Sequence, residues 1–148
     1  MKNYRGILRA NLLEEIRKIL PDFNYFYSKE ISGFDCKPES VNFDLSVGKT
    51  IFIRNTILVN DQDNLLLYGN LSEKFLKKNF SNLPVTLQYI SFTINNKPLS
   101  LYNIHGISYP GSKLDTAIRL EHSRILKKLL KEEAETKIVC GDFNLLPD

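Results

Sequence analysis

Two short patterns in the second half of the sequence place polar side chains where a run of apolar residues ends. Asn103 and His105 follow "LSLY", and Asp142 and Asn144 follow "KIVCG". Carboxylate and carboxamide oxygens accept hydrogen bonds, and an imidazole can donate or take up a proton near neutral pH. If these side chains meet, they can bind a polar ligand and perform acid–base chemistry on it.

Each pattern lies on one face of a predicted strand, because side chains two residues apart on a strand share a face. From Leu99 to His105 one face reads Leu, Leu, Asn, His, and from Ile138 to Asn144 it reads Ile, Cys, Asp, Asn. Both faces change from apolar to polar at the carboxyl end of the strand. We therefore expect the apolar residues that come first in each strand to pack in the core and so to hold its polar carboxyl end in place.

The segment between the two strands predicts that their polar ends meet. From Asp115 to Lys131, Ile118, Ile125 and Leu129 recur at helical spacing, with Asp115 expected to cap the helix. A strand–helix–strand unit of this length favours a parallel pair with a right-handed crossover. Ligands of α/β sheets bind beyond the carboxyl ends of the strands, so we expect the four polar residues to converge there. We call this place the mouth.

Each of these residues also has a structural explanation. Asp142 and Asn144 can form an Asx-type turn, because their side chains readily bond nearby backbone amides. A single histidine at the end of a strand is commonly structural. The joint occurrence of N-x-H and D-x-N on neighbouring strands favours a site over two unrelated turns.

The rest of the chain predicts further helices and strands of an α/β protein. An amphipathic helix is expected from Ile7 to Leu20, because apolar residues recur at helical spacing and Pro21 stops the run. Strands are predicted around residues 23–27, at 47–55 and within 57–70. Residues 87–94 and 98–106 predict an antiparallel hairpin, because alternating runs flank a short Asn-rich loop.

Composition restricts the protein to a few classes. With 148 residues, 43% hydrophobic and 25% charged, the chain is predicted to be one domain or one piece of one. Its net charge of +3 tolerates an anionic partner without requiring one. Cys36 and Cys140 are far apart in sequence, and Cys140 lies in a run that predicts a buried strand, so we expect a reduced intracellular chain. No signal-peptide core is evident and no apolar run approaches the ~18 residues of a membrane span, so we expect a cytoplasmic protein without membrane contact.

These segments resemble the endonuclease/exonuclease/phosphatase family, which comprises metal-dependent hydrolases with the deoxyribonuclease I-like fold. Gly141-Asp142-Phe143-Asn144 after an apolar strand is the most specific match, and "LYNIHG" and "GSKLDTAIRLEHSR" support it in the right order. "ILPDFNYFYSK" and "VGKTIFIRN" extend the resemblance over nearly the whole chain. It implies an α/β fold, part of a four-layer sandwich with two packed mixed sheets, outer helices and a site at one end of the sheets.

The resemblance also implies cleavage of a phosphodiester or phosphomonoester with Mg²⁺ or Mn²⁺. Asp142 would bind the metal and hold or deprotonate the attacking water, and Asn144 would position the water and the phosphate. His105 would donate to the phosphate or the leaving oxygen, with Asn103 beside the substrate. Mg²⁺ prefers oxygen ligands and keeps several waters, which suits a site with few carboxylates. Nucleic acid, sugar or inositol phosphates and lipids all stay open as substrates.

Three residues near the mouth have competing interpretations. Lys113, on a Gly-containing loop, is a candidate phosphate contact, with a solvated loop lysine as the alternative. Arg119 is expected to form a structural ion pair within the helix. His122 lies at the edge of the helix's apolar stripe, which favours a packing or surface role over a catalytic one.

The resemblance implies two motifs that residues 1–148 do not contain. A metal-binding glutamate should end a strand before the first helix, and a Ser-Asp-His motif should follow well beyond Asp148. On this interpretation the chain is a single incomplete domain, weakly active or inactive by itself. Two alternatives remain, a non-catalytic nucleic-acid or phosphate-binding module and an inert remnant of the enzyme. The oligomeric state is left open.

Overall fold

A computed structural model describes residues 2–4, 7–9, 12–32, 45–69, 84–107, 113–132 and 136–145. Two helices and eight strands are resolved within these ranges. In chain order they are β1 (Lys2–Tyr4), β2 (Ile7–Arg9), α1 (Leu12–Ile19), β3 (Phe23–Ser32), β4 (Ser46–Arg54), β5 (Val59–Tyr68), β6 (Val85–Ile94), β7 (Lys97–His105), α3 (Ala117–Glu132) and β8 (Thr136–Asp142).

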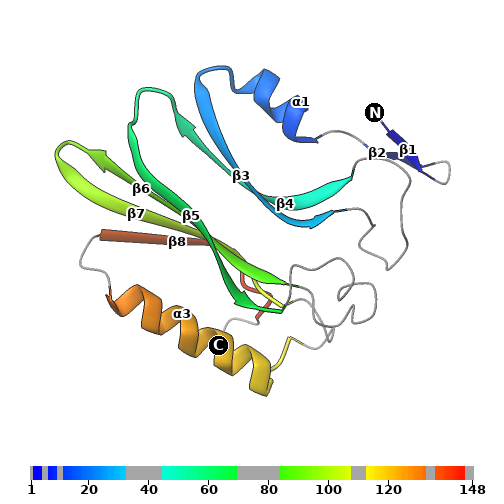
Figure 1. Ribbon diagram of the computed structural model, residues 1–148, viewed down its shortest axis with the longest axis vertical. Coiled ribbons are helices and arrows are strands. Elements are labelled where there is room, and N and C mark those ends of the chain that lie inside the picture. The colour runs from blue at the N-terminus through cyan, green and yellow to red at the C-terminus, as the bar shows by residue number, and fades with distance from the viewer. Residues whose placement is uncertain are drawn as a thin grey trace.

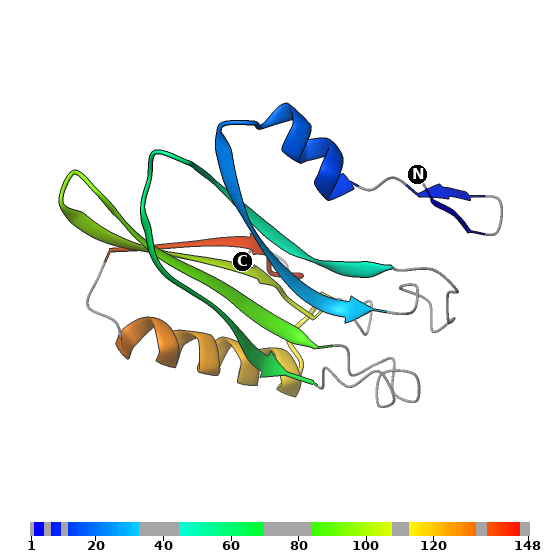
Figure 2. The same ribbon diagram turned by 45° about the horizontal axis from the view of Figure 1, so that its top comes forward.

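The elements form four layers, which Figures 1 and 2 show from two directions. α1 lies outside the two-stranded sheet of β3 and β4, and α3 lies outside the four-stranded sheet with the order β5-β6-β7-β8. The first three strands of the larger sheet are antiparallel, whereas β8 runs parallel to β7. The predicted α/β sandwich with a mixed sheet and outer helices is therefore confirmed.

Two apolar clusters hold the layers together, one on each face of the larger sheet. Leu87, Tyr102 and Ile104 face α3 and pack against its Ile125 and Leu126, among others. On the other face, Ile90 and Phe92 of β6 are buried against Ile51 and Ile53 of β4, with Leu99 and Leu101 beside them. This alternation is what a strand buried on both faces requires, and it fixes which residues of β7 point toward β3 and β4.

The parallel pair and the hairpin are confirmed, but two boundaries differ from those predicted. Residues 7–9 form β2, whose backbone pairs with β1, so the first helix begins at Leu12 instead of Ile7. The helix before β8 begins at Ala117, and the hydroxyl of Thr116 accepts a hydrogen bond from the Arg119 amide at 3.3 Å. Thr116 therefore takes the capping position predicted for Asp115.

β3 is longer than predicted, because ten residues from Phe23 to Ser32 pair with β4. The aromatic and polar composition of this segment is that of an exposed loop, and only the tertiary pairing makes it a strand. In the described part of the chain, no helix is long and apolar enough to cross a membrane.

Candidate active site

The mouth predicted from the sequence is present at the carboxyl ends of β7 and β8. His105 pairs with Asp142 and Asn103 pairs with Cys140 in the parallel register. Because Leu99 and Leu101 of β7 point toward β3 and β4, Asn103 and His105 point to the same side. The side chains of His105 and Asp142 are both exposed, so they are available to a ligand.

Asn144 ties three segments together beside this pair. Its backbone amide donates to Asp142 Oδ1 at 2.8 Å, and its side-chain Nδ2 donates to the Gly106 carbonyl at 2.9 Å. Lys113 Nζ donates to Asn144 Oδ1. Asn144 is buried and has a φ of 54°, a left-handed conformation that Asn adopts more readily than most residues. The predicted Asx-type turn therefore exists, and it orients the Asp142 carboxylate.

The two strand ends are also joined through their backbones. The Gly106 amide donates to the Asp142 carbonyl at 2.7 Å. Gly141 has a φ of 129°, and a Cβ there would lie 1.9 Å from the Ile104 carbonyl oxygen. Only glycine tolerates this backbone angle and this approach, so Gly141 permits β8 to lie this close to β7 just before Asp142.

Asn103 makes a contact that the sequence did not indicate. Its Nδ2 donates to Gln88 Oε1 at 3.2 Å, and Gln88 Nε2 donates to the Phe26 carbonyl at 2.6 Å. These bonds connect β7 through β6 to β3. The amide of Asn103 is thus held between the sheets, one row below His105.

A buried ion pair between Glu30 of β3 and Lys49 of β4 contacts β6 at the level of His105. Thr86 precedes Leu87, which pairs with Ile104, so Thr86 stands opposite His105. Lys49 Nζ donates to Thr86 O at 2.7 Å, to Thr86 Oγ1 at 2.6 Å and to Glu30 Oε1 at 2.5 Å. Thr86 Oγ1 in turn donates to Glu30 Oε1 at 2.7 Å. The three residues connect β3 and β4 to the strand beside His105.

Burial sets the protonation behaviour of Lys49. Its pKa is lowered from the usual range because burial disfavours the ammonium, although the hydrogen bond and charge of Glu30 oppose that shift. The three hydrogen bonds use all three ammonium donors. Lys49 therefore serves to join the sheets, and its bonds leave no donor for a phosphate.

The sequence patterns did not indicate Glu30, Lys49, Thr86 or Gln88 as part of the site. One signal for Lys49 was present, because Lys49, Ile51 and Ile53 share a face of the predicted strand. A lysine in line with two isoleucines indicates a buried charge that needs a partner. Its partners come from residues 19 and 37 positions away, which strand alternation alone does not reveal.

Arg119 and His122 are both buried, which agrees with the structural roles expected for them. Arg119 contacts the backbone at two points. Its guanidinium donates to the carbonyls of Leu114 at 2.8 Å and Ile107 at 3.2 Å, so it links the residue pair after β7 to the segment before α3. His122 is buried against Tyr68, with ring centroids 4.9 Å apart. Burial lowers the pKa of His122, and the charge of Glu121 opposes this shift.

The prediction that Cys140 is buried is wrong. Among the described strands β8 lies at the edge of its sheet, and β3 and β4 pack over β6 and β7, so Cys140 is exposed and Ile138 is 44% exposed. Cys140 is a free thiol whose Sγ lies 3.4 Å from the Tyr102 carbonyl. Cys36 lies outside the described residues.

The donor set at the mouth suits a hard cation with few protein ligands. Asp142 is exposed, and its bond to the Asn144 amide uses Oδ1, which leaves the second oxygen of the carboxylate for a cation. Mg²⁺ commonly binds proteins through one or two carboxylates and several waters. Within residues 12–32, 45–69, 84–107, 113–132 and 136–145, no three His, Cys, Asp or Glu side chains cluster to form a closed metal site.

Solved structures with the same fold were found, although no protein-family model matches the sequence and no curated protein matches it significantly. A mannosyl-6-phosphatase from Bacteroides thetaiotaomicron is 18% identical with a TM-score of 0.63, and the match covers 89% of this chain and 46% of that one. TDP2 from D. rerio, complexed with a single-strand DNA product, is 17% identical with a TM-score of 0.61, covering 95% and 46%.

An endonuclease/exonuclease/phosphatase protein from Bacteroides vulgatus is 16% identical with a TM-score of 0.62, covering 91% of this chain and 48% of that chain. At such identities these matches establish the arrangement of the backbone. The chain spans about half the length of the structures that it matches. Its layers, its parallel β7–β8 pair and these matches show that the chain has the deoxyribonuclease I-like fold, the fold of the endonuclease/exonuclease/phosphatase family.

Proposed function

We propose that this chain forms part of a divalent-metal-dependent phosphoesterase whose reacting groups lie at the mouth. The observation that carries the proposal is the pairing of His105 with Asp142 at the ends of two parallel strands. The fold supports it, because the matched proteins include a phosphatase and a protein bound to a DNA product. The substrate is a phosphate ester, with nucleic acid among the candidates.

The roles follow from what each side chain can do in its observed place. Asp142, oriented by the Asn144 amide, accepts a hydrogen bond from the attacking water and can take its proton. His105, at the same level, donates to a phosphate oxygen or to the leaving oxygen. Mg²⁺ or Mn²⁺ bound at Asp142 would supply positive charge for the phosphate.

Asn144 and Lys113 support these groups through the contacts already described. The Asn144 side chain is occupied by Gly106 and Lys113, so it acts by fixing the turn that presents Asp142. Lys113 brings its positive charge to this turn. From there the charge of Lys113 attracts an anionic substrate to the site beside Asp142, while Lys113 stays bonded to Asn144.

Hydrolysis of bis(p-nitrophenyl) phosphate and p-nitrophenyl phosphate by the chain tests this proposal. We expect release of p-nitrophenol that needs Mg²⁺ or Mn²⁺, stops with EDTA and falls about 100-fold or more in Asp142→Asn. Asp61→Asn is the matched control, because Asp61 is an exposed strand aspartate whose Oδ1 also accepts a backbone amide at 2.8 Å. Activity that survives Asp142→Asn would refute the proposal.

The alternative is a module that binds phosphate esters without cleaving them. The observation that favours it is the hydrogen bond from Lys113 to Asn144, which places a cation at the mouth. The same bond occupies the Asn144 side-chain oxygen, which the family resemblance implies would position the water. Binding of a phosphate ester that is insensitive to EDTA and to Asp142→Asn, with no metal-dependent hydrolysis, would select this function.

A further inference from the structure

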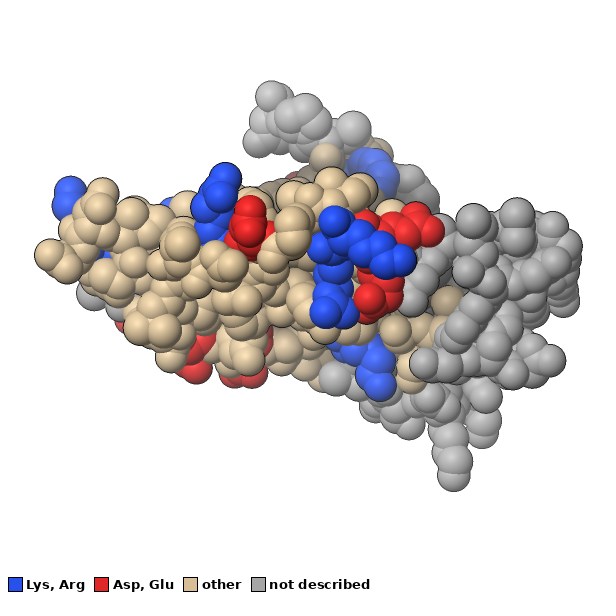
Figure 3. Space-filling model, turned by 90° about the horizontal axis from the view of Figure 1, so that it is seen from above, with Lys and Arg blue, Asp and Glu red and all other residues tan. Residues whose placement is uncertain are grey.

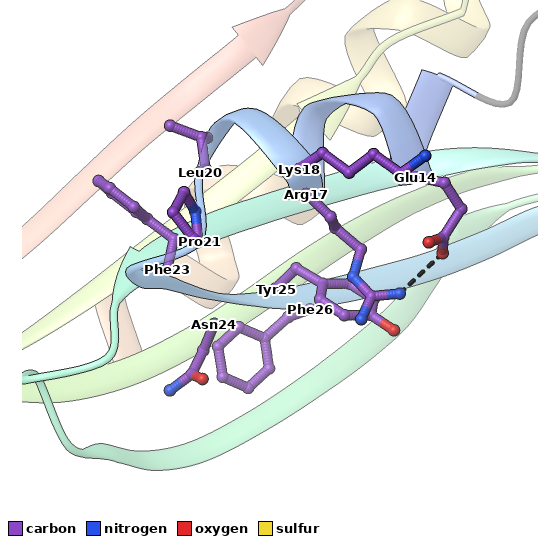
Figure 4. Close-up of a pocket in the computed structure, with 9 residues that line it drawn as sticks. All are labelled: Glu14, Arg17, Lys18, Leu20, Pro21, Phe23, Asn24, Tyr25 and Phe26. Carbon is purple, nitrogen blue, oxygen red and sulfur yellow. Dashed lines mark hydrogen bonds and ion pairs between the residues drawn. The ribbon is translucent and has the colours of Figure 1, made fainter.

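A groove separates α1 from the strand that follows it, on the opposite side of the molecule from α3. Its volume is ≈ 640 Å³, and it is lined by Glu14, Arg17, Lys18, Leu20, Pro21, Phe23, Asn24, Tyr25 and Phe26. Figure 4 shows these side chains, with Arg17 extending from α1 toward Tyr25. Sites for small ligands commonly have volumes of this size. α1 has no buried residue, which leaves the groove open.

Two guanidinium groups stack on aromatic rings, one in this groove and one beside it. The Arg17 guanidinium carbon lies 4.3 Å from the centroid of the Tyr25 ring, and the Arg54 guanidinium carbon lies 5.1 Å from that of Phe23. Tyr25 is 38% exposed, and its ring is 6.5 Å from that of Phe52. A guanidinium stacked on one ring presents its other face for a second flat ring.

The charge around the groove favours an anionic occupant. Arg17 and Lys18 line it with one acidic residue, Glu14, and Arg54 stands beside it over Phe23. Glu14 Oε1 accepts from Arg17 at 2.7 Å, a contact at the edge of the guanidinium that leaves the face turned away from Tyr25 for stacking. Figure 3 looks onto the molecule from above and shows basic side chains gathered next to acidic ones on this face.

We propose that the groove binds single-stranded nucleic acid. A base stacks on the face of the Arg17 guanidinium turned away from Tyr25, Asn24 offers donors and an acceptor to the edge of a base, and Lys18 and Arg54 contact the phosphates. Single-stranded nucleic acids bind where aromatic or guanidinium planes alternate with positive charge, because every base has a stacking face.

Fluorescence anisotropy of a labelled 12-nucleotide oligothymidylate tests the proposal. The titration is made with the whole chain in EDTA, so that its outcome does not depend on metal-dependent hydrolysis at the mouth. We expect binding at 50 mM NaCl that weakens steeply at 200 mM NaCl, because phosphate contacts release counterions. Arg17→Gln and Tyr25→Leu are each expected to weaken binding by about tenfold, the effect of losing one stacked plane.

Arg124→Gln is the matched control for Arg17→Gln. Arg124 pairs with Glu121 three residues earlier at 2.6 Å, as Arg17 does with Glu14, but it lies on α3. Arg124→Gln removes the same charge as Arg17→Gln. We expect it to change binding by less than about twofold, because Arg124 lies outside the groove and makes no contact with the bound strand. A 12-base-pair duplex is expected to bind more weakly, because its bases are already stacked. No binding at 50 mM NaCl, equal losses in Arg17→Gln and Arg124→Gln, or equal affinity for the duplex would overturn the proposal.

Discussion

His105 and Asp142 occupy the same level of two adjacent parallel strands, as direct partners in the register of β7 and β8. Neither side chain is buried. The Asp142 carboxylate is oriented by the turn that follows it, and the Gly106 amide bonds the Asp142 carbonyl across the two strand ends. An imidazole and a carboxylate are thereby held beside each other on a rigid base while both stay open to a ligand.

Replacing His105 is expected to lower the rate of hydrolysis without changing the stability of the fold. His105→Gln is expected to lower the rate of metal-dependent phosphodiester hydrolysis by about 10²- to 10⁴-fold, the range for a general acid. The free energy of unfolding should stay within about 0.5 kcal/mol, because the side chain is exposed. Initial rates and urea unfolding of the same preparation measure both. A variant that unfolds more easily yet keeps its rate would assign His105 a structural role.

Asn144→Asp tests the turn that presents Asp142. The substitution replaces the Nδ2 donor to the Gly106 carbonyl by an acceptor, inside a buried site. We expect the free energy of unfolding to fall by about 1–3 kcal/mol, the cost of leaving a buried polar group without its partner. Asn60→Asp is the control, because that exposed amide donates to the Thr93 hydroxyl, which can turn to donate instead. Urea unfolding should show a loss for Asn144→Asp alone.

Lys49→Met tests the buried ion pair next to the mouth. The change leaves the Glu30 carboxylate without its ammonium between the sheets, and removing one partner of a buried pair costs about 3–5 kcal/mol. Replacing both residues, as Lys49→Met with Glu30→Leu, should recover much of this loss because no buried charge remains. Arg124→Met, which breaks an exposed pair, should change stability far less than Lys49→Met does. Equal stabilities of the single and double variants would contradict the role assigned to this pair.

His122 makes stability depend on pH. Burial lowers its pKa in the folded state, so the unfolded chain binds a proton more readily. The stability that its neutral form contributes is complete above the unfolded pKa of about 6.5 and is lost as pH falls through the window below that value. Thermal unfolding from pH 5 to 8 should show this loss in wild type and in His105→Gln, but not in His122→Gln. The same pH dependence in His122→Gln would assign it to other groups.

Alternation along strands predicted the mouth, because Asn103, His105 and Asp142 continue apolar faces whose direction is set by the core. The parallel pairing followed from the helix between the strands, which is a property of local sequence. The fold class was equally accessible, through the residues around Asp142 that resemble the family.

The contacts of these side chains could not be predicted, since they depend on distant partners. Gln88 reaches Asn103 only because β6 pairs with β7 in one register, and Lys113 reaches Asn144 across 31 residues. Cys140 is exposed because the smaller sheet lies over β6 and β7, and strand alternation carries no information about how many strands a second sheet supplies.

Titration of the ¹⁵N-labelled chain with Mn²⁺, followed by NMR, tests the metal-dependent mouth most directly. Mn²⁺ broadens the signals of nearby nuclei, so the measurement reports binding whether or not the chain is active. We predict that the amide signals of His105, Asp142 and Asn144 broaden first, that excess Mg²⁺ restores them, and that Asp142→Asn abolishes the effect while Asp61→Asn preserves it. Broadening centred elsewhere, or unchanged in Asp142→Asn, would contradict the assignment of these strand ends as the site of phosphate-ester hydrolysis.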